Sequence, residues 1–403
     1  MDVLQPIRDL GEEVERAWGA IDFEESKFSI VASEVLARAN IRRRILEEVI
    51  HWTLAGPALF NRRMQTDGFG QPAIPVFRAN RFYVEVLFWL DATTTIHQHG
   101  FAGAFQVLEG SSLHTRYQFE CERLISPNLQ LGRLTTICHE VLREGDIRRI
   151  DAGQELIHSL FHLDHPSVTL VVRTYSDGNP GVQYDYLYPG VAFSPTIPSS
   201  ATLKARTLEL VWQTRKTSFT EQATAAVLSS SDTSLFYLLT ALVRNGADTR
   251  LLETVFAIAV DRHAEFAWRI VTALREYVRR IALNGRRSSI QDAPSRLILA
   301  ALIMCESRRS LLEVVGAAFG SKEPAEVFVQ VIGKVSAQGG LLTGAEIDEV
   351  AVETIRQVLE GRSRPEILDA VQSVYDIDPS STATLEDLYD ALSSSPTFCV
   401  LFR

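Results

Sequence analysis

The spacing of hydrophobic residues divides the chain into three stretches. In the first, which ends near residue 56, apolar side chains recur every three or four positions, as in the series Leu10, Val14 and Trp18. This period predicts amphipathic helices, and we expect two of them, the second ending at Gly56-Pro57. The glycine- and proline-rich segment from there to about residue 80 is predicted to be a loop.

At Phe82 the pattern changes to short runs of β-branched and aromatic residues separated by polar turns, and Phe82–Trp89 is the first of these runs. Such runs are typical of strands. A series of short strands with turns of Gly, Pro, Asn and Asp indicates an all-β sandwich or barrel. The strands are predicted near residues 82–89, 96–99, 104–109, 112–119, 134–142, 147–150, 156–162, 167–175 and 183–188.

The third stretch follows a segment rich in Pro and Ser, and its apolar positions again have a helical period. Leu235, Leu238 and Leu242 illustrate the period, and Asn245-Gly246 is a helix stop. Because no fixed repeat length emerges, an irregular helical bundle is favoured over a stacked helical array.

These patterns predict a two-domain protein: an all-β barrel of jelly-roll type with flanking N-terminal helices, then an all-α domain. We place the first domain at residues 1–195 with its barrel at about 76–190, a linker at 196–203, and the helical domain at 204–403.

Composition narrows the possible partners and location. The formal net charge of -10 argues against nucleic-acid binding, which depends on Lys and Arg. No uncharged apolar run is long enough to cross a membrane, so we expect no membrane association. The four cysteines lack CxxC spacing, which indicates reduced thiols. With no signal-peptide pattern at the start, we expect a cytoplasmic protein.

The candidate chemistry centres on the segment Thr93 to Gly100, which contains His97 and His99. Side chains at i and i+2 of a strand lie on one face, so these imidazoles can bind one metal ion if a later strand supplies a third ligand. We predict that His158 does so, against the alternative that all three are structural. Imidazole suits Fe, Ni, Cu or Zn. His162 would share the strand face of His158, as a further contact or alternative ligand, although a surface position is favoured for His162 and for His165.

These motifs resemble the cupin superfamily. Its first motif has HxH, then Glu, then Gly; His97, His99 and Gly110 match, but Gly103 or Ala104 stands where Glu is usual. Gly145, Gly153 and His158 are similar to the second motif. The missing Glu makes the chain resemble the cysteine-dioxygenase-type thiol dioxygenases, in which three histidines hold one iron(II).

The resemblance implies further site residues. Tyr175 matches the family's catalytic tyrosine, and Trp89 its pocket-lining tryptophan. Arg78 is the nearest match to the arginine that binds the substrate's carboxylate, with Arg62 as a rival.

The chain also departs from the family. Val171 and Arg173 replace a Ser and a His that precede the tyrosine, and Ala104 stands where animal enzymes carry the cysteine cross-linked to it. Arg173 offers a guanidinium for carboxylate recognition from the opposite wall. These departures put cysteine itself in doubt as the substrate.

The leading hypothesis is therefore a mononuclear iron(II) dioxygenase that acts on O₂ and a small thiol or related metabolite, with His162, Arg78 and Trp89 near the substrate and Tyr175 and Arg173 as catalytic residues. Zn, Ni or Cu are the other metals that the ligand set allows. The alternatives are another metal-dependent cupin enzyme, such as a lyase or isomerase, and a non-catalytic ligand-binding cupin whose helical domain binds a partner. The helical domain is also a candidate for homo-oligomer formation.

Overall fold

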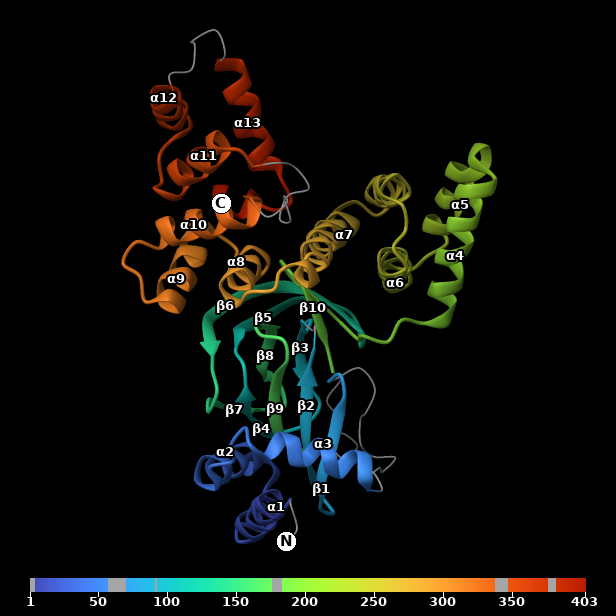
Figure 1. Ribbon diagram of the computed structural model, residues 1–403. Coiled ribbons are helices and arrows are strands. Elements are labelled where there is room, and N and C mark those ends of the chain that lie inside the picture. The colour runs from blue at the N-terminus through green and yellow to red at the C-terminus, as the bar shows by residue number, and fades with distance from the viewer. Residues whose placement is uncertain (1–3, 57–69, 91–92, 176–182, 338–346, 376–381) are drawn as a thin grey trace.

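The computed structural model describes residues 4–56, 70–90, 93–175, 183–337, 347–375 and 382–403. Its N-terminal helices cover one side of a central β-barrel, and the helices that follow the barrel pack against the other side (Figure 1). The predicted fold class is confirmed, since the strands lie between residues 73 and 193 and the later elements are helical. None of the described helices has the length and apolar character needed to cross a membrane.

Three α-helices precede the barrel, one more than the sequence predicted: α1 (Gln5–Gly19), α2 (Phe28–Ala39) and α3 (Ile45–Ala55), with a 3-10 turn at Glu25–Lys27. Their apolar faces pack on strand β2 (Phe82–Trp89). Strand β2 is buried along its whole length because alternate residues serve two faces. Phe82, Val84 and Val86 contact the helices, and Glu85 faces the barrel interior.

The strands form two facing sheets. One has five strands in the order β1-β2-β9-β4-β7, and the other closes on itself in the order β10-β11-β6-β5-β8-β3. The interior cavity between them is lined from both, for example by Val171 of the first sheet and His97 of the second. The remaining strands are β1 (Ala73–Arg78), β3 (Ile96–His99), β4 (Gly103–Glu109), β5 (Ser112–Ser126), β6 (Leu129–Leu142), β7 (Ile147–Ile150), β8 (Gly153–His162), β9 (Ser167–Thr174), β10 (Asp185–Leu187) and β11 (Val191–Phe193).

Two strands were missed by the sequence prediction. Strand β1 lies in the predicted loop; its Pro75 is tolerated because β1 is an edge strand with a register irregularity there. Strand β11 has three residues, too few to show a period, and exists because it pairs with β6 and β10. The first helix after the barrel begins at Ser199, inside the predicted linker.

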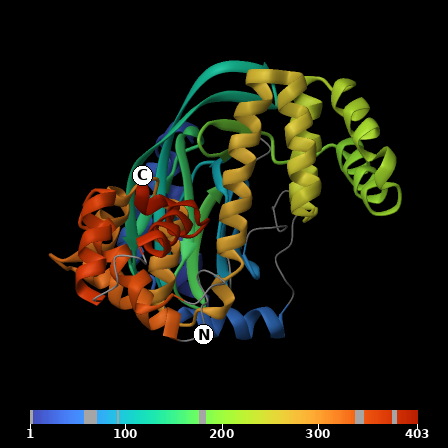
Figure 2. The same cartoon turned by 90° about the horizontal axis from the view of Figure 1, so that it is seen from above.

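The helices after the barrel form two groups that each share a core with it. In one, α4 to α7 pack on Leu131 and Phe193; in the other, α8 and later helices pack on Leu113 and Phe161. The part of α7 that follows the kink at Ala264 extends along the barrel between the groups (Figure 2). The bounds are α4 (Ser199–Thr214), α5 (Lys216–Leu228), α6 (Asp232–Arg244), α7 (Thr249–Asn284), α8 (Ala293–Met304), α9 (Arg308–Phe319), α10 (Pro324–Ala337), α11 (Glu349–Leu359), α12 (Arg364–Tyr375) and α13 (Thr382–Ser394), with 3-10 turns at Arg287–Ser289 and Cys399–Phe402.

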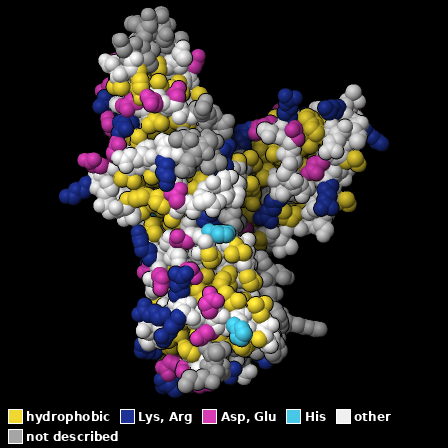
Figure 3. Space-filling view, viewed as in Figure 1, with side chains coloured by type: hydrophobic (Ala, Val, Ile, Leu, Met, Phe, Trp, Pro, Cys, Tyr) yellow, Lys and Arg dark blue, Asp and Glu magenta, His cyan; other side chains and the backbone are white. Residues whose placement is uncertain are grey.

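Charged side chains of both signs are interspersed on the face that Figure 3 shows.

Candidate metal centre

Three histidines meet inside the barrel. His97 and His99 project from the same side of β3, and His158 on β8 is the direct register partner of His97. One ring nitrogen from each of the three lies within 4.8 Å of the others. The exposed fractions of His97, His99 and His158 are only 2%, 5% and 3%. The pairing of β3 with β8 thus converts an HxH motif and a distant histidine into one cluster.

Hydrogen bonds orient two of these rings. The Nδ1–H of His97 donates to the backbone oxygen of Thr95 at 2.9 Å. The Nδ1 of His114 lies 2.8 Å from a carboxylate oxygen of Glu140, and its Nε2 lies 2.9 Å from the Nδ1 of His158. Because a carboxylate accepts, His114 donates from Nδ1 and accepts from the Nδ1–H of His158. The Nε2 lone pairs of His97 and His158 are therefore directed into the cluster, as metal ligands require.

Electrostatics keep the cluster neutral. Burial lowers the pKa of His97 to about 4, and burial with mutual repulsion lowers the pKa values of His99 and His158 well below their ordinary range. Neutral imidazole is the form that binds metal. Hydrogen bonds from His114 and Arg148 lower the pKa of Glu140 to about 2, so this carboxylate is ionised and holds His114 in the required tautomer.

The cluster fits a divalent metal ion. The Nε2 atoms of His99 and His158 are 2.8 Å apart. Two imidazole nitrogens bound to one ion at about 2.1 Å each are separated by about 3 Å when they subtend a right angle. The three histidines can hold such an ion, and imidazole donors select the Fe, Ni, Cu and Zn group.

A cavity of about 50 Å³ adjoins the histidines. Its charged lining residues are Glu85 and Arg173, which form a buried ion pair at 3.4 Å. The Arg173 guanidinium lies 3.4 Å above the centre of the Phe101 ring. Burial raises the pKa of Glu85, and the nearby Arg173 opposes that rise. The cavity therefore places a paired acid and guanidinium beside the candidate metal position.

Gly103 explains the missing carboxylate ligand. It is the register partner of Arg173 on β9, and a Cβ atom at Gly103 would lie 2.2 Å from the backbone oxygen of Val172. No side chain fits there unless β9 moves. Ala104, the other candidate for the Glu position, is fully buried against the N-terminal helices. Neither residue supplies an oxygen ligand.

The structure places two of the predicted site residues away from this cavity. The hydroxyl of Tyr175 donates to the backbone oxygen of Ala79 at 3.0 Å, and its ring stacks on Tyr83 with 5.1 Å between centres. Arg78 is exposed at the end of β1. Neither side chain is among those lining the cavity. The rival Arg62 lies outside the described residues.

Trp89 lines the cavity, whereas His162 contacts the Trp89 ring and does not line the cavity. The indole N–H of Trp89 donates to Thr169 at 3.1 Å, and its ring stacks on His162 at 4.5 Å. The surface position favoured for His162 is wrong: the residue is 0% exposed. The hydroxyls of Ser112 and Ser167 lie 2.9 and 2.7 Å from its Nδ1, and these partners from two other strands make burial favourable. His165, in contrast, is exposed as expected.

Sequence reasoning overlooked Glu85, His114 and Glu140. The sequence did contain a signal for Glu85, which is the charged residue within the apolar run Phe82–Trp89. Because Glu85 and Trp89 are four positions apart on one strand, their side chains share the face that lines the cavity. His114 and Glu140 gave no such signal. They are register partners on β5 and β6, and their connection to His158 depends on how β5 pairs with β8.

Comparison with known proteins assigns no family to the chain. No protein-family model matches the chain, and no curated protein matches it. Among solved structures, the protein TT1209 from Thermus thermophilus matches at 20% identity over 28% of this chain and 91% of its own, with a TM-score of 0.19. Hydroquinone 1,2-dioxygenase from Sphingomonas sp. TTNP3 matches at 10% identity over 27% and 68%, with a TM-score of 0.22. Oxalate decarboxylase from Lactobacillus farciminis matches at 19% identity over 27% and 30%, with a TM-score of 0.20.

Matches at this level assign no activity. The chain's own fold and site define its class: a β-barrel between two sets of helices, with a buried three-histidine cluster that can hold a divalent metal ion.

Proposed function

We propose that the protein is a mononuclear iron(II) dioxygenase that acts on a small thiol or related metabolite. The observation that carries the proposal is a cluster of three neutral histidines, with Gly103 or Ala104 rather than Glu at the motif position that would supply a carboxylate ligand. With three neutral ligands, a bound iron(II) ion keeps its full positive charge and supplies the one-electron chemistry that lets O₂ react with a spin-paired thiolate.

The residues around the histidines would bind the substrate and exclude water. Arg173 is the cation among the lining residues, and its position over Phe101 fixes the guanidinium against one wall. It would attract an anionic group of the substrate. Its ion pair with Glu85 would offset part of the positive charge that the substrate meets. Trp89 and Phe105 make the remaining wall apolar.

The pair formed by His114 and Glu140 would hold His158 in the tautomer that presents Nε2 to the ion. It would do so without charge on the imidazoles, since the pKa of His114 is lowered by burial despite the nearby Glu140. Such partners preserve the orientation of a ligand through turnover.

A second candidate is a metal-dependent lyase or isomerase that uses no O₂. The observation that favours it is Glu85, a buried carboxyl with a raised pKa in the same cavity. A carboxyl whose pKa is moved toward neutrality can exchange a proton with a substrate held beside it. In the dioxygenase, Glu85 would only position Arg173.

The deciding experiment is metal analysis of anaerobically purified protein, followed by an oxygen-electrode screen across small thiols. We expect about one iron per chain and thiol-dependent O₂ uptake, both lost in His99→Ala. His51→Ala is the matched control, because His51 is an exposed residue of α3 far from the barrel interior. The dioxygenase proposal fails if the iron-loaded protein consumes no O₂ with any thiol. Turnover without O₂ that is lost in Glu85→Gln would then support the second candidate.

A further inference from the structure

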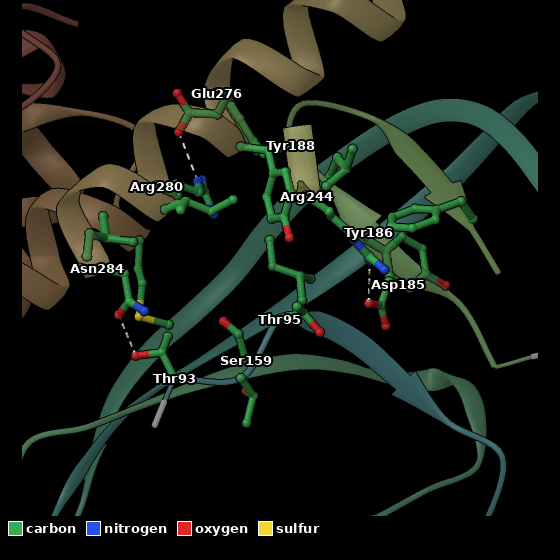
Figure 4. A pocket seen from close by; sticks show the side chains of 18 residues that line it. Thr93, Thr95, Ser159, Asp185, Tyr186, Tyr188, Arg244, Glu276, Arg280 and Asn284 are labelled. Carbon is green, nitrogen blue, oxygen red and sulfur yellow. Dashed lines mark hydrogen bonds and ion pairs between the residues drawn. The ribbon is translucent and has the colours of Figure 1, made fainter. Parts of the chain in front are cut away.

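A second cavity of about 220 Å³ lies where the barrel meets the later helices. Strands β3 and β10 form one wall, and helices α7 and α8 form the facing wall (Figure 4). None of the three clustered histidines lines it, nor do Glu85 or Arg173. It shares only Thr94 with the metal-site cavity. We refer to it as the junction cavity.

The junction cavity contains the guanidinium of Arg280, whose carboxylate neighbour Glu276 also pairs with Arg279. Arg280 on α7 donates from Nε to Glu276 at 2.9 Å. The same carboxylate also accepts two hydrogen bonds from Arg279, at 2.7 and 2.9 Å. Glu276 thus pairs with both arginines, and Glu306, which does not line the cavity, is a second carboxyl that interacts with Arg280. Arg279 is directed away, to the backbone oxygens of Leu302 and Pro396, so Arg280 is the arginine of the two that lines the cavity.

Hydroxyl groups surround this guanidinium. Tyr188 and Arg280 both point into the space between α7 and the barrel, and Ser159 and Thr95 lie on the barrel side (Figure 4). The Arg280 guanidinium is 5.4 Å from the centre of the Tyr188 ring. A guanidinium with nearby hydroxyl donors is the arrangement that binds a carboxylate.

The other charged pair in the cavity is self-contained. Arg244 lies 3.9 Å from Asp185 and donates to the backbone oxygen of Pro195 at 3.2 Å. The opposite charges of Arg244 and Asp185 balance, so the pair adds no net negative charge. The rest of the lining is largely apolar, with Ile96, Phe193 and Met304 among its members. An apolar lining favours a ligand with an apolar body.

We propose that the junction cavity is a second ligand site, separate from the metal centre, which binds a small organic carboxylate with an apolar body. The carboxylate meets Arg280 and the Tyr188 hydroxyl, and the apolar body lies between α7 and strand β3. The proposal does not depend on the dioxygenase activity, because the metal ligands take no part in it.

Isothermal titration of chelator-treated, metal-free protein with benzoate and hexanoate tests this site. Benzyl alcohol and hexanol are the matched neutral probes. We expect both carboxylates to bind and both alcohols to bind at least about tenfold more weakly, since a charge-assisted hydrogen bond is lost. The proposal is overturned if neither carboxylate binds or if the alcohols bind equally well.

Variants locate the binding. Arg280→Gln should raise the Kd of benzoate at least about tenfold, and it leaves Glu276 paired with Arg279. Arg275→Gln, on the same helix but more than half exposed and bonded to Glu253, should leave binding unchanged. If Arg280→Gln does not fold, Tyr188→Phe provides the test, with an expected several-fold rise in Kd. His99→Ala should bind benzoate as the wild type does. Loss of binding in His99→Ala, or wild-type binding in Arg280→Gln and Tyr188→Phe, would show that the carboxylate binds elsewhere.

Discussion

At the scale of the residue, the candidate metal centre depends on side chains that the motif itself does not contain. The HxH spacing accounts for His97 and His99 on one strand face. The orientation of His158 depends on His114, and that of His114 on Glu140. Both of these partners are contributed by strands other than that of the motif, β5 and β6. A pattern of ligands therefore predicts which residues bind, and the structure shows what orients them.

Replacing His114 should weaken metal binding without removing a ligand. In His114→Ala the Nδ1–H of His158 has no acceptor, so the ring loses its fixed tautomer and orientation. We expect the metal Kd to rise about 10- to 100-fold, measured by competition with a chromophoric chelator. His165→Ala, which changes an exposed histidine of the same barrel, should leave the Kd unchanged. Equal Kd values for His114→Ala and the wild type would show that His114 does not position His158.

Several predicted residue roles stay predictions. Tyr175 was chosen because it occupies the family's tyrosine position, yet its hydroxyl bonds to backbone at the rim of the barrel. Arg173 was chosen as a replacement carboxylate binder, and it does line the cavity, with Glu85 as its partner. Arg173 lines the cavity and Tyr175 does not, because β9 ends at Thr174. The alternate residues Thr169, Val171 and Arg173 face the cavity, and this alternation stops before Tyr175.

At the scale of the element, periodicity predicted strands and helices wherever a segment buries a regular face. The strands predicted at 96–99 and 147–150 have those bounds in the structure. The failures are β1, with a proline, and β11, with three residues, and pairing partners determine both. Helix α7 contains a further irregularity with no sequence signal: Ala264 has φ 45° and ψ −123° within an otherwise helical segment.

A glycine at position 264 should stabilise the protein. A positive φ is costly for alanine and free for glycine, and Ala264 is exposed, so no packing is lost. We expect Ala264→Gly to raise the free energy of unfolding by about 1 kcal/mol, measured by urea denaturation. The matched control is Ala282→Gly, at an exposed position of regular α7, which should lower it by about 0.5–1 kcal/mol. If both substitutions lowered the free energy of unfolding, Ala264 would not have the positive φ that defines the kink.

At the scale of the whole molecule, the helices after the barrel are part of its packing. Arg287, which is 2% exposed, follows α7 and donates to the backbone oxygen of His162 and to Thr93. Its guanidinium lies 4.8 Å from the centre of the Phe161 ring. Each helical group also shares an apolar core with barrel strands. We therefore expect barrel and helices to unfold together.

Substituting Arg287 tests that expectation. In Arg287→Met the oxygen of His162 loses a charged donor, which should lower the free energy of unfolding by about 1.5–3 kcal/mol. Helical circular dichroism and tryptophan fluorescence should still report one shared transition, at a lower temperature. Arg309→Met, at a residue whose side chain is 89% exposed, should change stability by less than about 0.5 kcal/mol. Two separated transitions in the wild-type protein would show that the parts fold independently.

Local pattern was sufficient for the features that depend on neighbouring residues. The order of helical, β and helical stretches, the inward pair His97 and His99, and the absence of Glu at positions 103 and 104 all follow from spacing of a few residues. Tertiary structure decided what depends on residues far apart in the chain. The burial of His162, the link from His158 to Glu140, the Glu85–Arg173 pair and the junction cavity each require strand register or helix docking. The physical reason is that side-chain periodicity encodes which face an element buries, whereas the partner on that face is set by packing of the whole chain.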